Sequence, residues 1–191
     1  MKFVENEFSS TLEIKKSKFI THICQYDTFE LMMKRLQNEH PKARHFVYAY
    51  RYLNDFEQIV ENSSDDGEPK GTSGKPSLTV LRGSNLINTG VIIVRYFGGI
   101  RLGTGGLVKA YSDAVNQVIT KSKLIEYKKL EIKTIELNYN LLGQIEYLFN
   151  QNNITILNKE FTSNIILYLS ATKDDFNKLE IKLPLNITLQ N

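Results

Sequence analysis

The chain has 191 residues and a formal net charge of +3 at pH 7, with 41% hydrophobic and 24% charged residues. These values are typical of a globular protein that can bury a sizeable core. The single cysteine, Cys24, excludes an internal disulfide framework and fits a reducing compartment, where we expect it to be a small buried hydrophobic residue.

Targeting and membrane signals are not expected in this sequence. The opening segment MKFVENEFSS has acids at Glu5 and Glu7 and no long apolar core, so it does not resemble a signal peptide. The most apolar run, GVIIV, is far shorter than the ~20 residues that a membrane helix needs. We therefore expect a cytoplasmic protein with no membrane partner.

The first part of the chain predicts alternating strands and helices. The pattern around KKSK predicts a hairpin from about Ser9 to Ile23, and TFELMMKRLQNEH predicts a helix that ends before Pro41. HFVYAYRYL predicts a strand. A polar connection rich in turn residues, NDFEQIVENSSDDGEPKGTSGKP, comes next. The strand carries an aromatic ladder that either packs in the core against a helix or forms a base-stacking platform: Phe46, Tyr48, Tyr50 and Tyr52.

Three further elements follow this connection. SLTVLRG predicts a short helix that ends at Gly83, although it is also compatible with a strand. The continuous apolar run TGVIIVRYF predicts a strand that is covered on both faces. From Thr104 or Gly105 to about Ser122, the spacing of apolar residues predicts an amphipathic helix.

Residues 131–191 differ in composition, with one glycine, one proline and many Ile, Leu and Asn residues. They predict a βαββαβ order, which is the split pattern of ferredoxin-like domains. The expected elements are a strand at 132–139, a helix at 141–152, strands at 154–161 and 165–171, a helix at 173–179 and a strand at 185–189. We therefore expect an α+β chain of two domains that divide near residue 128.

Charge is distributed unevenly within the first domain. No acid occurs from Pro69 to Ser112. Such a one-sign stretch attracts anions, including nucleic-acid backbone, unless the adjacent acids Asp65, Asp66 and Glu68 neutralise it. Charge alone leaves both interpretations open. The stretch holds six basic residues: Lys70, Lys75, Arg82, Arg95, Arg101 and Lys109.

Five glycines lie in the segment RYFGGIRLGTGGLVKAYS, where the predicted strand gives way to the predicted helix: Gly98, Gly99, Gly103, Gly105 and Gly106. The segment is not a dinucleotide fingerprint, which needs glycine in place of Val108, nor a Walker A motif, which needs lysine in place of Thr104. The first amides of a helix lack intrahelical acceptors, so with Arg101 and Lys109 nearby the turn can bind a phosphate or carboxylate. Alternatively, the glycines only permit positive φ angles and close packing.

Other candidate residues give weaker signals. The acids Asp65, Asp66 and Glu68 fit an EF-hand loop poorly, because its twelfth position is Ser73 instead of a bidentate glutamate. The three histidines lack metal-binding spacing. Arg44 and His45 open a predicted strand, where they either line a polar cleft or have an ordinary role at the strand edge; Arg51 follows on the same strand. We expect no metal, no cofactor and no catalytic constellation.

Two long segments, DDGEPKGTSGKP and VIIVRYFGGIRLGTGGLVKAYSDA, closely resemble the signature of the IMPACT (YigZ-like) family. KARHFVYAYR and KKSKFI resemble further motifs of that family, in the same order, and the resemblance covers the whole chain. One departure is Ser73, where many members have alanine. The resemblance implies an N-terminal domain at 1–128 like the second domain of ribosomal protein S5, and a ferredoxin-like domain at 129–191.

The resemblance also implies a role in translation. Eukaryotic relatives compete for a large ribosome-associated activator and so restrain a stress kinase that phosphorylates an initiation factor. Bacteria lack that pathway in this form, so the resemblance does not transfer this partner. Fold analogy alone does not establish function either.

The resulting hypothesis is a non-catalytic cytoplasmic regulator of translation that binds RNA, the ribosome or a ribosome-associated protein through a basic, glycine-rich cleft. In this hypothesis the basic residues neutralise phosphates or acidic side chains, the glycines expose main-chain amides, and the acids orient the loop or a basic partner group. The alternatives are an enzyme or sensor that binds a small phosphorylated ligand in the same cleft, and an adaptor that works through the C-terminal sheet. The candidate binding residues are Arg44, His45, Arg51, Asp65, Asp66, Glu68, Arg95, Gly98, Gly99, Arg101, Gly103, Gly105, Gly106 and Lys109.

Overall fold

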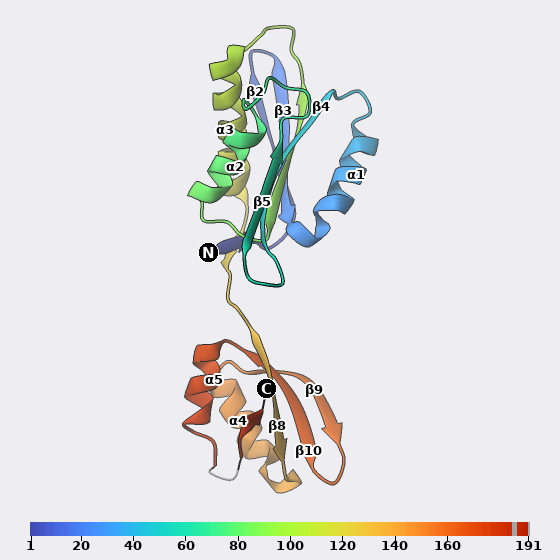
Figure 1. Cartoon of the computed structure of the whole chain (residues 1–191). Coiled ribbons are helices and arrows are strands. Elements are labelled where there is room, and N and C mark those ends of the chain that lie inside the picture. The colour runs from blue at the N-terminus through green and yellow to red at the C-terminus, as the bar shows by residue number, and fades with distance from the viewer. Residues whose placement is uncertain (185–186, 191) are drawn as a thin grey trace. The chain divides into compact units, whose positions relative to one another are not determined.

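The computed structural model describes residues 1–184 and 187–190, and the chain divides into two compact units, Met1–Tyr127 and Lys128–Asn191. Both units mix helices and strands, which confirms the expected α+β class (Figure 1). Within the described residues, no helix is long and apolar enough to cross a membrane, and no group of His, Cys, Asp and Glu side chains is arranged to hold a metal ion.

The N-terminal unit is built on one antiparallel sheet of five strands in the order β2-β3-β6-β4-β5. The β2–β3 pair confirms the hairpin expected from about Ser9 to Ile23. A short antiparallel pair, β1 (Lys2–Val4) with β7 (Leu124–Glu126), joins the two ends of the unit. The strands of the main sheet are β2 Phe8–Ile14, β3 Ser17–Gln25, β4 His45–Leu53, β5 Ile59–Ser64 and β6 Thr89–Tyr96.

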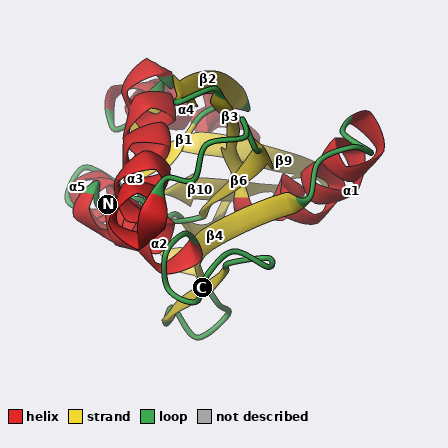
Figure 2. Cartoon of the chain, turned by 90° about the horizontal axis from the view of Figure 1, so that it is seen from above, coloured by secondary structure: helices red, strands yellow, loops and turns green. Residues whose placement is uncertain are grey.

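Helices cover both faces of this sheet. Helix α1 (Phe29–Glu39), which follows the 3₁₀ turn η1 (Tyr26–Thr28), packs on one face. Helices α2 (Gly74–Gly83) and α3 (Gly103–Lys121) pack on the other, so the unit has three layers (Figures 1 and 2). The predicted helices after residue 28 and after residue 103 are both confirmed.

The strand β6 belongs to both cores. Ile92 and Val94 lie in the cluster under α1, whereas Val91 and Ile93 lie in the cluster under α2 and α3. All four side chains have no exposed surface, which confirms the prediction of a strand covered on both faces. Cys24 lies in the α1 cluster, where burial raises the pKa of its thiol to about 11.

The aromatic ladder of β4 packs in the core rather than forming an exposed platform. Phe46, Tyr48 and Tyr50 are partly buried against the α1 cluster. Tyr52 stacks on Tyr26 with a centroid separation of 3.9 Å. These rings face the helix, which confirms the packing interpretation of the two that the sequence left open.

Two elements differ from the sequence prediction. The polar connection contains a strand, β5, which pairs with β4. Its polar side chains do not predict a strand, and the backbone hydrogen bonds to β4 are what make it one. Helix α2 begins at Gly74 instead of near Ser77, because Pro76 is tolerated in a first helical turn and the carboxylate of Asp65 accepts the amide of Gly74.

The C-terminal unit has one antiparallel sheet in the order β11-β8-β10-β9. The expected strand at 185–189 begins on residues 185–186, which lie outside the described residues, and the described strand β11 is Leu189–Gln190. A buried apolar cluster lies between the sheet and its two helices. The elements are β8 Glu131–Leu137, η2 Tyr139–Leu141, α4 Leu142–Gln151, β9 Thr155–Phe161, β10 Ile165–Ala171, α5 Lys173–Glu180 and β11.

Candidate functional site

Two adjoining pockets lie where β6 ends and α3 begins. The larger, of about 450 Å³, is formed by the residues before β4, the loop after β5, the end of β6 and the first turn of α3. The smaller has about 280 Å³, and the two pockets share Arg44, His45, Arg95 and Phe97. We call the two pockets together the basic groove. Another hollow, of about 460 Å³ between α1 and residues 5–7, contains none of the predicted site residues.

The floor of the basic groove is a buried ion pair. Arg95 Nη1 donates to Glu68 Oε1, and the side chains are only 7% and 4% exposed. The hydroxyl of Tyr111 on α3 donates to the same oxygen at 2.9 Å. Burial, followed by the negative charge of Glu68, raises the pKa of Tyr111. The charge of Arg95, which we expected to neutralise a ligand, is therefore already balanced within the fold.

One atom of this ion pair lacks a partner. Arg95 Nε is buried, and no acceptor for it occurs in the described part of the chain. The guanidinium also lies over two aromatic rings, 5.4 Å from the centroid of Phe19 and 5.7 Å from that of Phe97. Buried donors are normally hydrogen-bonded, so this nitrogen is an exception that a bound acceptor would explain.

The carboxylate of Asp65 organises the loop before α2. It accepts the amides of Gly71 at 2.7 Å, Ser73 at 3.1 Å and Gly74 at 2.8 Å, and the hydroxyl of Ser73 at 2.7 Å. Burial raises the pKa of Asp65, but these hydrogen bonds outweigh burial and hold the pKa below its usual value. Asp65 therefore shapes the loop and does not line the groove.

Asp66 holds the same loop against β4. Its carboxylate accepts the amide of Phe46, and its carbonyl accepts a hydrogen bond of 2.7 Å from Nδ1 of His45. Because a carbonyl only accepts, the proton of His45 is on Nδ1, which leaves Nε2 as an acceptor in the neutral ring. Asp66 thus positions His45 at the wall of the groove.

The remaining basic candidates fall into two groups. Arg44 and Arg101 are exposed and line the groove. Lys109 lies further along α3, 77% exposed, and pairs with Asp113 at 2.9 Å. Arg51 is buried elsewhere, where it donates to Glu61 at 2.6 Å and to a backbone carbonyl at 2.8 Å. The expectation that Arg51 and Lys109 belong to the cleft is therefore wrong.

The glycines do not share one role. A Cβ on Gly98 would lie 2.0 Å from the backbone carbon of Lys16, so close packing excludes any side chain. Gly99 and Gly103 have φ angles of +85° and +74°, and a Cβ on Gly106 would lie 3.1 Å from that of Leu102.

Neither close packing nor a positive φ angle requires glycine at position 105. It lies in the first turn of α3 with no positive φ, and an added Cβ would meet nothing within 4 Å. Glycine at an exposed helical position costs about 1 kcal/mol relative to alanine.

The structure adds groove residues that sequence reasoning missed. Phe97 is 56% exposed and lines both pockets, and Thr104 and Leu102 line the larger one. The available signal for Phe97 was a large apolar residue between a buried strand and the glycine pair Gly98 and Gly99. Lys42, two residues before Arg44 in the sequence, also lines the smaller pocket, and it lies outside the acid-free stretch from Pro69 to Ser112.

The chain is similar to several known proteins. The family model described as the Impact N-terminal domain matches residues 15–119, and a domain of unknown function, DUF1949, matches residues 135–184. An IMPACT family member from Haemophilus influenzae is 39% identical, covering 84% of this chain and 80% of that protein. IMPACT family member YigZ from Escherichia coli is 40% identical, with 90% and 85% covered. A crystal structure described as a hypothetical protein has a TM-score of 0.67 at 32% identity, covering 99% of this chain and 95% of that one.

Proposed function

Because the chain belongs to the IMPACT family, we propose that it is a cytoplasmic regulator of translation that binds RNA of the translation apparatus in the basic groove. The regulatory role rests on the family, since the eukaryotic relatives that the sequence motifs resemble act on translation. The choice of RNA as the partner rests on the chemistry of the groove. The ribosome presents such RNA, so the ribosome is the expected site of action.

Arg44 and Arg101 carry this proposal. Both are exposed in the groove, and neither has an ion-pair partner among the residues that the structure describes. A guanidinium binds phosphate oxygens in a bidentate manner and remains charged at all relevant pH values. Phe97 lines the same groove with an exposed ring, on which a base can stack. Cations beside an exposed aromatic ring are typical of single-stranded nucleic-acid sites.

The other groove residues support binding without a chemical step. Glu68 and Arg95 form the floor, and Asp66 sets the orientation of His45. No nucleophile with a positioned base is part of the proposal, so the proposed function is non-catalytic and requires no cofactor.

We also propose specific folds and boundaries for the two domains. Residues 1–128 would form a domain like the second domain of ribosomal protein S5, and residues 129–191 a ferredoxin-like domain. The latter is supported by the βαββαβ order and by the strand order β11-β8-β10-β9, in which the first and third strands of the domain are central.

The proposal is tested by measuring the affinity for a single-stranded RNA of about twelve nucleotides at several salt concentrations. Each phosphate contact contributes about 0.7 to the slope of log K against log salt. Replacing both Arg44 and Arg101 with alanine should therefore lower the slope by about 1.4. Co-sedimentation with ribosomes should weaken in parallel.

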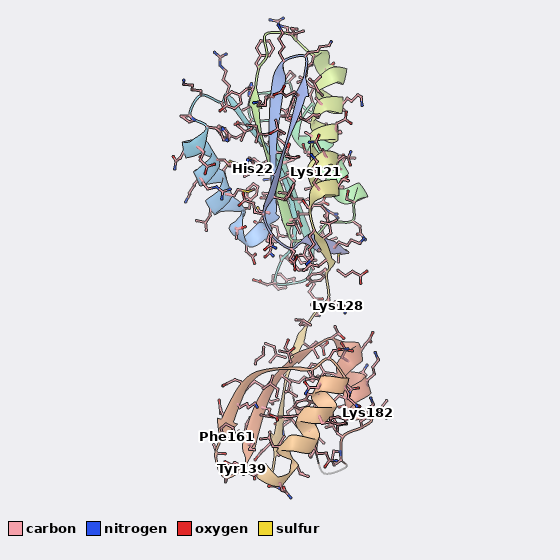
Figure 3. All side chains as sticks on the ribbon, turned by 180° about the vertical axis from the view of Figure 1, so that it is seen from behind. His22, Lys121, Lys128, Tyr139, Phe161 and Lys182 are labelled. Carbon is pink, nitrogen blue, oxygen red and sulfur yellow. The ribbon has the colours of Figure 1, made fainter. Side chains whose placement is uncertain are left out.

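Lys121→Ala is the matched control. Lys121 is an exposed cation at the opposite end of α3 from the groove, and it is labelled in Figure 3. Its loss should leave the slope unchanged. Binding that does not respond to salt, or a double variant that binds as tightly as the original chain, would contradict the proposal.

A second candidate is a sensor or enzyme that binds a small phosphorylated ligand in the same groove. The volume of the larger pocket, about 450 Å³, favours it because small-molecule sites usually span about 300 to 1,000 Å³. A thermal-shift screen with nucleotides and phosphosugars tests it, since a ligand that binds only the folded chain raises the melting temperature.

A further inference from the structure

We propose that the larger pocket recognises a terminal phosphate monoester, with the nucleotide that carries it placed against Phe97. The inference rests on the proposed function, because it specifies which part of an RNA the groove selects: a phosphorylated end instead of the middle of a strand. A free nucleoside monophosphate carries the same terminal phosphate, and a comparison of RNA octamers with a free nucleotide separates the two sources.

The phosphate position is the first turn of α3. This helix has 19 residues, and within the described residues neither a side-chain cap nor an acidic residue of its first turn neutralises its first amides. The amides and the positive end of the helix dipole together favour an anion. Gly103 and Thr104 line the pocket directly. At α2, by contrast, the carboxylate of Asp65 already accepts the amides of Ser73 and Gly74.

Arg95 is a second and independent indication of a ligand. The residue is 6% exposed, it lines the same pocket, and its Nε has no partner in the described part of the chain. Glu68 accepts a hydrogen bond from Nη1 of the guanidinium. A guanidinium has five donors, so the floor of the pocket keeps hydrogen-bonding capacity that a phosphate oxygen could use after a small side-chain adjustment.

Gly105 lies in the same first turn, although it is not among the residues that line the pocket. Its missing side chain leaves open space over the first turn of α3, and neither packing nor backbone conformation requires glycine there. A phosphate that contacts main-chain amides must approach the backbone closely.

A monoester matches the donor set better than an internal phosphodiester does. A terminal phosphate carries a charge of about −1.5 to −2 and three acceptor oxygens, whereas a diester within a strand carries one charge. Arg44 and Arg101 supply two guanidiniums, and the first turn of α3 supplies amides. The pairing of Glu68 with Arg95 prevents the buried carboxylate from repelling the ligand.

The adjoining pocket provides space for the base. It has about 280 Å³ and shares Phe97 and Arg44 with the larger pocket. Phe97 is 56% exposed, so its ring is available for stacking. Stacking on an aromatic ring tolerates any base, which suits recognition of an end instead of a sequence.

The test compares RNA octamers of one sequence that carry a 5′-phosphate, a 3′-phosphate or hydroxyls at both ends, together with adenosine 5′-monophosphate. One of the phosphorylated octamers should bind at least tenfold more tightly than the hydroxyl-ended octamer. Adenosine 5′-monophosphate should compete with it for the pocket.

Gly105→Asp is the informative variant. Aspartate is favourable in the first turn of a helix, and the site is open, so the variant should fold at least as well as the original chain. Its carboxylate would add a negative charge to the turn that forms the phosphate position, which should abolish the preference for a phosphorylated end. Asn116→Asp makes the same charge change at an exposed position further along α3 and should preserve that preference.

The outcomes separate the two proposals. Equal binding of all three octamers would overturn the terminal-phosphate inference while leaving RNA binding intact. Binding of adenosine 5′-monophosphate alone, lost in Gly105→Asp, would support the phosphate site but overturn RNA as its source. Binding of none of these probes at low salt would overturn both proposals.

Discussion

The hydroxyl of Tyr111 on α3 donates a hydrogen bond of 2.9 Å to the carboxylate of Glu68, on the loop that follows β5. This contact connects the helix at the groove to the loop that closes its floor. The same carboxylate oxygen accepts Nη1 of Arg95, so one buried atom joins three segments that are distant in the sequence. The shape of the basic groove depends on this junction.

Removing the donor, the hydroxyl of Tyr111, should affect the free energy of unfolding much less than removing the acceptor, the carboxylate of Glu68. Tyr111→Phe deletes one hydrogen bond and should lower the free energy of unfolding by about 1 kcal/mol. Glu68→Ala leaves Arg95 buried without its counter-charge and should cost about 3–5 kcal/mol. Urea unfolding followed by circular dichroism measures both values. If Glu68→Ala lowered the free energy of unfolding no more than Tyr111→Phe does, the buried ion pair of Glu68 and Arg95 would not be a major contribution to stability.

The glycines Gly98 and Gly105 should respond in opposite directions to alanine. Gly98→Ala forces a Cβ to within 2.0 Å of the backbone of Lys16 and should destabilise the chain by about 1–3 kcal/mol. Gly105→Ala places the same methyl group in open space on a helix and should stabilise the chain by about 1 kcal/mol. The shift in melting temperature, measured for each variant, gives the sign directly. Equal signs would contradict the division of roles among the glycines.

The contribution of Asp65 to stability should depend on pH. Hydrogen bonds in the folded state lower its pKa, so the stabilisation is present above the unfolded pKa of about 3.8 and is lost as pH falls through the folded value. Asp65→Asn should therefore cost about 2 kcal/mol at pH 7 and progressively less below pH 4. Unfolding curves of the two proteins at pH 7, 5 and 3 test this. A constant difference across that range would show that the charge of Asp65 is not what matters.

The stability of the chain should depend on pH also through His22, which lies on the opposite face of the sheet from α3. Both ring nitrogens are buried and lack hydrogen-bond partners in the described residues, although Nδ1 lies 3.6 Å from Glu7. Burial lowers the pKa of His22, and the attraction of Glu7 only partly offsets it, while the charges of Arg35 and His40 lower it further. The unfolded chain therefore binds the proton more readily. Stability should be retained above pH 6.5 and lost as pH falls toward the folded pKa.

His22→Leu isolates this effect, because it replaces the ring with an apolar side chain of similar bulk. The variant should lose less stability than the original chain between pH 7 and pH 5. Melting temperatures recorded across this range provide the measurement. His45→Leu is the matched control, since His45 is not among the groups that act on the pKa of His22 and its Nδ1 has a partner in the carbonyl of Asp66 at 2.7 Å. Identical pH profiles for the original chain and His22→Leu would exclude His22 as the source.

Local sequence patterns predicted most of the elements but fewer of the site contacts. The apolar run of β6 and the helical spacing of α3 depend on burial, which hydrophobicity records directly. The sequence did not predict the strand β5, because its polar residues become a strand only through their pairing with β4. The role of Arg51 was missed for a similar reason: its carboxylate partner, Glu61, lies on a different strand. Charge patterns in a sequence do not reveal which cations are already paired.

The double burial of β6 has a consequence for how the N-terminal unit opens. Since Val91 and Ile93 belong to one core and Ile92 and Val94 to the other, neither core can come apart while the other remains intact. The amides of β6 should therefore exchange with deuterated water only through global opening of the unit. Arg95 extends from the end of this strand, so the groove floor is anchored to the most slowly exchanging part of the unit.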